Sequence, residues 1–497
     1  MLSYRRSIHL PVLKMFVCLI LLLFSGIVFA ETSIIGYSQQ SSATERNNAR
    51  LIVKDGSGTL HVVYYDNGIY HSFSNDGAYT WSAPVLISGN GRNPAIAVGG
   101  DGELHLVYRL GCIAAYEIVH RAYSGMWSEE TIVYHSPQVS VSRPALAVDS
   151  SGDLHCVWQR SGYGVTPNSE IWYSKHTESG WSAAINISNS YGASEYPTLA
   201  IGTNDNVHVF WKDSGEDISN PKMVLYREYT VGSGWDAGYS NVSNTTGNGS
   251  YSTMDPCAIV DSKNDVHLVW KDCQTGNKEI FYKKCTAGIW DETPLNLSGT
   301  NEASDTPIIS VDDSDNLSVA WAEKTDGIHY DIILRKYSSS SGDWSTATNI
   351  SNTIGSDSRY PNMPTVVEQD PVCIWTEGET YSYGIICLSP DNASAVDEGG
   401  VSTPSSQAIL LPNHPNPFNP ATEISFKLSD NAMVSLVIRD LRGRLINTLV
   451  AGRRPAGVNH AVWYGRNNKG GTVSSGVYFS CLTIDGICDV RKMTLIR

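Results

Sequence analysis

Five histidines share one position in similar segments of the chain, and histidine is both a frequent metal ligand and a frequent acid–base catalyst. The segments resemble "GDLHCVWQR" (152–160), and their histidines are His61, His105, His155, His208 and His267. Two weaker copies, at 315–321 and 370–375, have Ser318 and Val372 instead. Because the copies are about fifty residues apart, we expect their side chains to be too far apart to share one ion. We therefore predict a structural role for them, in packing or in hydrogen bonds between repeat units.

Arginines at the ends of expected strands indicate anion binding. They are Arg92, Arg109, Arg143, Arg160 and Arg359, near the variable loops 159–170, 212–222 and 243–255. A guanidinium group binds carboxylate and sulfate oxygens through paired hydrogen bonds. We predict that these arginines bind acidic groups on a glycan. The alternative is that they pair with nearby acids such as Glu117 and Glu170.

The elements that position these residues form a repeat of four short strands with Gly, Asn, Asp and Ser at the turns. Successive units open at Pro94, Pro144, Pro197, Pro256, Pro307 and Pro361, which are fifty to fifty-nine residues apart. This period predicts an all-β fold, a β-propeller of four-stranded blades. We expect seven blades, with six as the alternative, and a ring closed by residues 33–39 as the missing strand of the last unit.

Oxygen-rich turns and cysteines offer less specific chemistry. The turns 149–153, 261–265 and 312–316 are acidic, but they lack the later glutamate of an EF-hand loop, and hairpin turns favour the same residues. We therefore predict no metal or cofactor, with calcium as the minority alternative. Cys373 and Cys387 are candidates for a disulfide across a hairpin, whereas Cys112, Cys156 and Cys257 could equally be buried free thiols.

The segment "SNDGAYTW" (74–81) resembles the Asp box, or BNR repeat, of sialidase-like propellers through Ser74, Asp76, Thr80 and Trp81. Ala78 replaces the usual glycine. The resemblance implies a propeller over residues 31–390 and a structural turn, not an active site. It also keeps a sialidase-type glycoside hydrolase open as an alternative, with Glu323 and Glu377 as candidate carboxylates, although the Phe-Arg-Ile-Pro motif of such enzymes is absent. We predict no catalytic residues.

The chain begins with features of a signal peptide. Three basic residues precede an apolar run over 15–28, and small residues end at Ala30. The run is shorter than the roughly twenty residues needed to cross a bilayer, and no later segment is as apolar. We predict that residues 1–30 are removed on export, so that the mature protein is secreted or displayed on the cell surface without a membrane span.

Charge divides the mature chain in two. Residues 31–407 carry 21 basic against 45 acidic residues, whereas residues 408–497 carry 11 against 5. The acidic part would repel nucleic acid. Residues 391–407 are small and polar, and we predict that they form a linker.

The C-terminal segment, residues 408–497, resembles the type A sorting domain of the type IX secretion system, itself similar to the immunoglobulin-like domain of FlgD. The matching motifs are "PNPFNPAT" (415–422), "VSLVIRDLRGRLINTL" (434–449), "AGVNHAVWYGRNNKGGTVSSGVYF" (456–479) and "RKMTLIR" (491–497). The resemblance implies a small β-sandwich recognised by the export machinery. A purely structural module is the alternative.

Together these features predict a bacterial recognition protein whose propeller binds a glycan or another extracellular polymer. The alternatives are an extracellular glycoside hydrolase and a non-catalytic scaffold.

Overall fold

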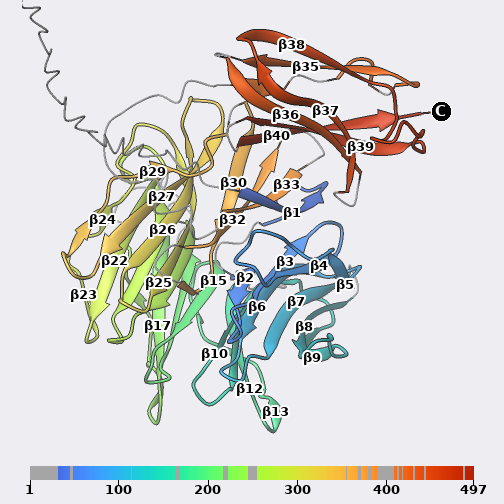
Figure 1. Cartoon of the computed structure of the whole chain (residues 1–497). Helices are drawn as coiled ribbons and strands as arrows, with labels where there is room; N and C mark the ends of the chain where they lie inside the picture. The colour runs from blue at the N-terminus through green and yellow to red at the C-terminus, as the bar shows by residue number, and fades with distance from the viewer. Residues whose placement is uncertain are drawn as a thin grey trace, which may run out of the picture.

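The structure, a computed structural model, describes residues 32–44, 49–112, 115–162, 168–215, 222–244, 254–353, 355–367, 371–378, 383–388, 408–410, 413–416, 418–428, 431–440, 444–484 and 487–496. All regular secondary structure in these residues is β-strand, as predicted (Figure 1). The described part of the chain contains no helix long and apolar enough to span a membrane. The predicted signal peptide and linker lie outside the described residues.

The third sheet shows how one repeat folds. Its strands β10 (Val141–Val148), β11 (Leu154–Arg160) and β12 (Glu170–Thr177) are antiparallel, and two short pieces, β13 (Gly180–Trp181) and β14 (Ile185–Asn186), pair with β12. β11 is buried along nearly its whole length. Both faces of the sheet therefore pack against neighbouring sheets, as the repeat requires.

Seven such sheets precede residue 390 in the described residues, and we number them 1 to 7 along the chain. Sheet 1 comprises β2 (Ile52–Lys54), β3 (Leu60–Tyr65), β4 (Ile69–Ser74) and β5 (Val85–Ser88). Sheet 2 comprises β6 (Arg92–Val98), β7 (Leu104–Cys112), β8 (Ala115–Tyr123) and β9 (Thr131–Ser136). Sheet 4 comprises β15 (Ser194–Ile201), β16 (Val207–Asp213), β17 (Met223–Thr230), β18 (Gly234–Trp235) and β19 (Ser240–Asn241).

The remaining sheets follow the same order. Sheet 5 comprises β20 (Met254–Val260), β21 (Val266–Asp272), β22 (Glu279–Thr286), β23 (Ile289–Trp290) and β24 (Leu295–Asn296). Sheet 6 comprises β25 (Ser304–Asp312), β26 (Leu317–Lys324), β27 (Tyr330–Ser338), β28 (Asp343–Trp344), β29 (Thr348–Asn349) and the parallel strand β31 (Val366–Val367). Sheet 7 comprises β30 (Asp357–Asn362), β32 (Cys373–Gly378), β33 (Tyr383–Leu388) and β1 (Thr32–Ser38).

Sheet 7 joins the two ends of this region. β1 is antiparallel to β33, from Thr32 opposite Leu388 to Ser38 opposite Tyr383, which confirms the predicted pairing of the N-terminal strand. The buried Asn362 then links sheet 7 to sheet 1: its side-chain oxygen accepts a hydrogen bond from the Leu51 N–H (2.9 Å), and its amide group donates to the Ala49 carbonyl (2.9 Å).

The first strands of six sheets each contain a β-bulge just before the proline that marks the repeat. The residue before the proline has a positive φ of 49° to 58° in every case, at Asn93, Arg143, Tyr196, Asp255, Thr306 and Tyr360. This conformation is costly for residues other than glycine. Bulges change the direction of side chains and frequently lie beside functional sites. The end of the first strands that carries these bulges is therefore a candidate location for a functional site.

The predicted disulfide between Cys373 and Cys387 is wrong for this structure, in which both are free, buried thiols. Cys387 lies opposite Ile374, and Cys373 lies opposite Leu388. Side chains alternate between the faces of a strand, so this one-residue offset places the two sulfur atoms on opposite faces of sheet 7. Cys373 packs with Trp375, whereas Cys387 packs with Ile385.

Residues 408–497 form two further sheets. One contains β34 (Ala408–Leu410), β35 (Thr422–Leu428) and β38 (Gly457–Trp463). The other contains β37 (Leu445–Arg454), β36 (Ala432–Asp440), β39 (Gly476–Ile484) and β40 (Ile487–Leu495). Their shared core includes Phe426, Leu436 and Trp463.

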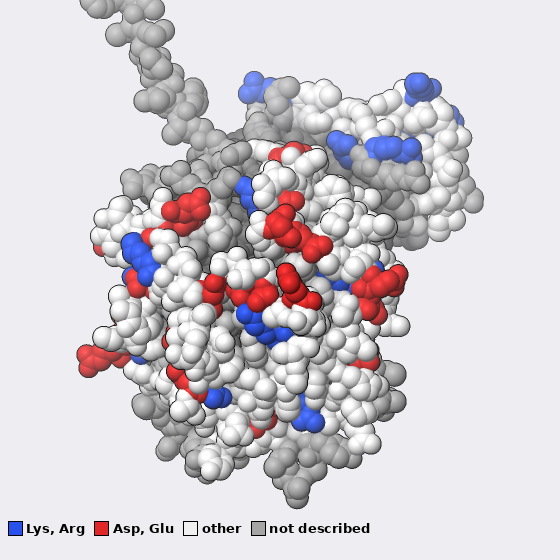
Figure 2. Space-filling view, turned by 90° about the horizontal axis from the view of Figure 1, so that it is seen from below, with Lys and Arg blue, Asp and Glu red and all other residues white. Residues whose placement is uncertain are grey.

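The C-terminal sheets lie next to β1 and β33 (Figure 1), and the rings of Tyr37 and Phe479 stack with centroids 5.7 Å apart. Figure 2 shows basic side chains on the C-terminal lobe at the upper right and many acidic side chains over the rest of the molecule. The two parts therefore differ in charge at the surface as well as in sequence.

Candidate functional site

Four of the five predicted arginines lie at corresponding strand ends of sheets 2 and 3, and we call Arg92, Arg109, Arg143 and Arg160 the arginine rim. Arg92 in β6 is directly opposite Arg109 in β7. Arg160 ends β11, and Arg143 occupies the bulge of the adjacent β10. The first strands β6 and β10 contact each other, so the two arginine pairs belong to neighbouring sheets.

Each rim arginine lies over an aromatic ring. The guanidinium carbon is 5.5 Å from the ring centre of Tyr65 for Arg92, 5.0 Å from Tyr116 for Arg109, 4.0 Å from Tyr196 for Arg143 and 5.2 Å from Trp172 for Arg160. Cation–π contacts of this kind hold the plane of a guanidinium group while leaving N–H groups at its edge. The rings therefore orient the rim arginines without neutralising them.

The acids expected to neutralise these arginines have other partners. Glu117 is paired with His135 at 2.8 Å, and Glu170 accepts a hydrogen bond from the Ser188 hydroxyl. Within the described residues no carboxylate forms an ion pair with the arginine rim, and the alternative of surface pairing with Glu117 or Glu170 is wrong.

Hydrogen bonding at the rim is incomplete. Arg143 donates to the Gln159 side-chain oxygen at 2.9 Å. The Nε atoms of Arg109, Arg143 and Arg160 are buried, with no hydrogen-bond partner among the described residues. Burial also lowers the pKa of Arg109 from its ordinary value, a sign that its charge is poorly solvated.

Two lysines that the sequence reasoning missed continue this series of cations. Lys212 is 2.6 Å from Glu195 and 5.4 Å from the ring centre of Tyr196. Lys271 lies between Asp255 at 3.0 Å and Asp305 at 2.5 Å. Both follow a buried tryptophan in the repeated "WKD" (211–213 and 270–272), the position that Arg109 occupies in sheet 2. Since carboxylates neutralise both lysines, neither adds unpaired positive charge beside the arginine rim.

Arg359, the fifth predicted arginine, has a different environment. It lies within β30 in sheet 7, where its Nε is 2.9 Å from Asp357 and its guanidinium carbon is 3.9 Å above the ring of Tyr330. It lines a cleft of about 420 Å³ together with Tyr360 and Tyr383. Because Asp357 neutralises it, Arg359 does not share the property that distinguishes the arginine rim.

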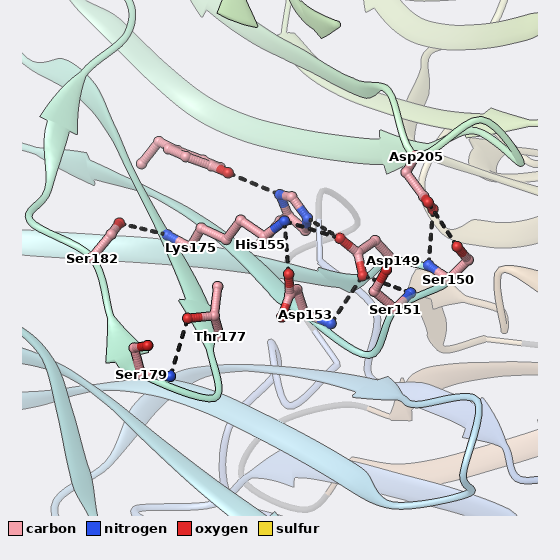
Figure 3. A network of polar contacts seen from close by, with 11 residues as sticks. Asp149, Ser150, Ser151, Asp153, His155, Lys175, Thr177, Ser179, Ser182 and Asp205 are labelled. Atoms are coloured by element: carbon pink, nitrogen blue, oxygen red, sulfur yellow. Dashed lines mark hydrogen bonds and ion pairs between the residues drawn. The ribbon is translucent and has the colours of Figure 1, made fainter. Parts of the chain in front are cut away.

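The repeat histidines are buried and bonded within their own sheets. His155 contacts the Tyr173 hydroxyl at 2.9 Å through Nδ1 and Asp149 at 3.1 Å through Nε2 (Figure 3). His267 has the same two kinds of contact, with Tyr282 and Asp261. His208 contacts Tyr226, His61 contacts His71, and His105 contacts His120. These five hydrogen bonds each lie within one sheet, so the hydrogen bonds between repeat units that the sequence also allowed are not among them. The described histidines also do not gather at one site.

In the acidic turns, carboxylate oxygens accept hydrogen bonds from N–H groups of the same turn. One oxygen of Asp149 accepts from the N–H groups of Ser151 and Asp153, at 3.0 and 2.9 Å. The neighbouring Ser150 donates through its N–H (2.8 Å) and its hydroxyl (2.7 Å) to Asp205 in the next sheet (Figure 3). Among the described residues, no cluster of three or more His, Cys, Asp or Glu could hold a metal ion.

The turn at 74–81 is closed by Asp76, which accepts hydrogen bonds from the Ser74 hydroxyl (2.8 Å) and the Thr80 N–H (2.9 Å). Trp81 donates through Nε1 to the Ser33 hydroxyl of β1 at 3.0 Å. Ala78 has a φ of 75°, a conformation that favours glycine. The four motif residues therefore form a compact turn that ties sheet 1 to the N-terminal strand.

The carboxylates considered for hydrolysis, Glu323 and Glu377, have repeated structural partners. Trp321 donates through Nε1 to Glu323 at 2.8 Å, and Trp375 donates to Glu377 at 3.0 Å. A serine of the adjacent first strand also donates to each. Burial raises the pKa of both carboxyl groups. The same tryptophan–glutamate hydrogen bond occurs in sheet 6 and in sheet 7, which indicates a structural role in the repeat. These two residues therefore do not support the hydrolase alternative.

Comparison with known proteins finds a family match in the C-terminal part of the chain and similar solved structures for most of its length. Residues 415–480 match the FlgD Ig-like domain, which agrees with the predicted β-sandwich. No curated protein matches the chain. A polysaccharide lyase, a PL25 ulvan lyase solved bound to -[GlcA(1-4)Rha3S]-, is similar with a TM-score of 0.50 and 12% identity, covering 73% of this chain and 96% of the lyase. This likeness supports a propeller-like fold.

Two other solved structures are more distant. The Hadza microbial sialidase Hz136 has a TM-score of 0.41 and 12% identity, with 69% of this chain and 74% of the sialidase covered. PorZ, a surface component of the type-IX secretion system of Porphyromonas gingivalis, has a TM-score of 0.39 and 16% identity, with 90% of this chain and 60% of PorZ covered.

Proposed function

We propose that this chain is an extracellular recognition protein whose arginine rim binds a polysaccharide bearing carboxylate or sulfate groups. One observation carries the proposal: four guanidinium groups are held on aromatic rings, and no carboxylate of the described residues neutralises them. They lie in a part of the chain that is strongly acidic overall. A local surplus of positive charge maintained in such surroundings indicates an anionic partner.

The scaffold of this site, in our proposal, is a closed seven-bladed propeller over residues 31–390. The first strands β2, β6, β10, β15, β20, β25 and β30 contact one another in that order. The pairing of β1 with β33 and the bonds of Asn362 to residues 49 and 51 supply the connection between the last sheet and the first. The turn at 74–81 would be the Asp box of this ring.

The binding chemistry follows from the arrangement of the rim. A carboxylate or sulfate can accept two hydrogen bonds from one guanidinium edge. Exposed Tyr191, in the loop between sheets 3 and 4, offers an apolar ring face to a sugar. Such a site suits acidic polymers, the chemical class of the oligosaccharide in the ulvan lyase structure.

The terminal segments complete the proposal. Residues 1–30 would direct export and be removed, residues 391–407 would act as a linker, and residues 408–497 would be the sorting domain read by the type IX export machinery. The FlgD Ig-like match supports the fold of that last domain. These roles place the arginine rim outside the cytoplasm, where acidic polysaccharides occur.

Replacing Arg143 and Arg160 together by alanine should lower the affinity for dextran sulfate and for polygalacturonate about tenfold or more. The expectation rests on charge-assisted hydrogen bonds contributing about 1.5–3 kcal/mol each. Isothermal titration calorimetry or biolayer interferometry would measure it, with uncharged dextran as the matched ligand without sulfate groups.

The control variant is Arg359→Ala, which removes an arginine that Asp357 already neutralises. It should leave both affinities within about twofold of the parent protein, because a surface ion pair contributes little. Equal binding of dextran and dextran sulfate, or unchanged affinity in the double variant, would rule out the arginine rim as the site.

A further inference from the structure

Arg50 is bonded to three sheets other than its own. It precedes β2, and its carbonyl accepts a hydrogen bond from the Ile96 N–H of β6 at 2.9 Å. Its side chain donates to the Ile309 carbonyl of β25 at 2.7 Å and to the Met363 carbonyl beyond β30 at 3.1 Å. Residues in or directly after the first strands of three other sheets therefore bond to this one residue, which indicates a position near the axis of the proposed ring.

The charge of Arg50 has no counterion among the described residues. Its recorded partners are two neutral carbonyl groups. Burial lowers the pKa of Arg50 from its ordinary value, but a guanidinium group stays protonated in proteins, so this position carries a full positive charge. Isolated charges away from bulk water are strongly unfavourable unless they are paired.

The guanidinium group also has donors to spare. It has five N–H bonds, of which the two recorded hydrogen bonds use two. Arg50 is half-buried, so part of the residue remains open to small species. We propose that Arg50 binds a small inorganic anion, chloride or one of similar size and charge, on the axis of the propeller.

Such an anion would help to hold the ring closed. Arg50 connects sheets 1, 2, 6 and 7 through its backbone and side chain, and a bound anion would remove the cost of placing its charge there. Anything that binds only the folded state raises its stability. The inference rests on the ring closure proposed above but is independent of polysaccharide binding.

Thermal unfolding of the chain without its first thirty residues tests the site, with sodium chloride compared with sodium gluconate at equal ionic strength. We expect a Tm about 2 °C or more higher in chloride. Arg50→Met should lower the Tm and abolish the difference between the two salts. Arg335→Met is the matched control, because Arg335 also donates to a carbonyl of a neighbouring sheet, Leu297, at 2.7 Å. It should lower the Tm but keep the difference.

A crystal of the unmodified protein grown in sodium bromide decides the point even if Arg50→Met does not fold. An anomalous peak within hydrogen-bonding distance of the Arg50 guanidinium would establish the site. A bromide dataset without such a peak, or equal Tm values of the parent protein in chloride and gluconate, would overturn the proposal. Loss of dextran sulfate binding in the arginine rim variants would affect neither result.

Discussion

Acidification from pH 8 to pH 5 should lower the free energy of unfolding by about 4 kcal/mol through His71 and His120 alone. Burial lowers the pKa of each to about 3, and a neighbouring histidine, His61 or His105, lowers it further. In the unfolded chain both titrate near 6.5. The unfolded state therefore binds more protons below pH 6.5, so stability is complete above that pH and is lost as the pH falls toward 3. At pH 5 the loss is about 2 kcal/mol per residue.

The contacts of these histidines explain why the folded state resists protonation. His61 Nδ1 is 3.0 Å from His71 Nε2, and His105 Nδ1 is 3.2 Å from His120 Nε2. One ring of each pair must donate and the other must accept, so a proton on the acceptor nitrogen would remove the bond. Sheets 3, 4 and 5 have Tyr173, Tyr226 and Tyr282 at the position of the second histidine.

The double variant His71→Tyr/His120→Tyr places a tyrosine at the corresponding positions of sheets 1 and 2. A tyrosine side chain does not titrate in the acid range. Urea unfolding at pH 8 and pH 5 should show an acid-induced loss smaller by about 4 kcal/mol than in the parent chain. His135→Tyr is the control substitution, because His135 is half exposed and belongs to neither buried histidine pair. An unaltered pH dependence in the double variant would show that neither buried histidine contributes to acid sensitivity.

Replacing Lys271 by methionine should cost about 3–5 kcal/mol of stability at neutral pH, the usual effect of removing one partner from a buried ion pair. The lysine is 3% exposed and lies between Asp255 and Asp305. Burial acts to lower the pKa of Lys271, but the two carboxylates outweigh it and the pKa is raised. Methionine fills similar volume without charge, so both carboxylates would lose this partner in a site with little water.

Urea unfolding at pH 7 would measure this loss, and Lys278→Met provides the comparison. Lys278 contacts the same Asp305 at 3.1 Å, but its side chain is 42% exposed. Its removal should cost about 1 kcal/mol or less. If both variants lost the same amount, burial would not be what makes Lys271 important.

Most of the strands and turns of the repeat could be predicted from short stretches of sequence. The repeated histidine segment, the prolines that open each unit and the turn residues predicted the strands and the pairing of residues 33–39, which the structure places in β1 opposite β33. Asp76 and Asp149 could be read as turn residues, because their carboxylates bond N–H groups four residues away or fewer. Interactions of this range depend on the local chain alone.

The site required the tertiary structure. That Arg143 would lie over Tyr196, fifty-three residues later, and that Glu117 and Glu170 would be engaged elsewhere, depends on how neighbouring sheets pack. The offset of Cys373 from Cys387 depends on a strand register that shifts by one residue without changing the sequence pattern. Arg50 shows the same limit, since its partners Ile309 and Met363 lie more than 250 residues away. Periodicity and turn chemistry are properties of adjacent residues, and so the sequence by itself determined the strands and their order. Which charges meet, and which stay without a partner, was decided only when the sheets packed against one another.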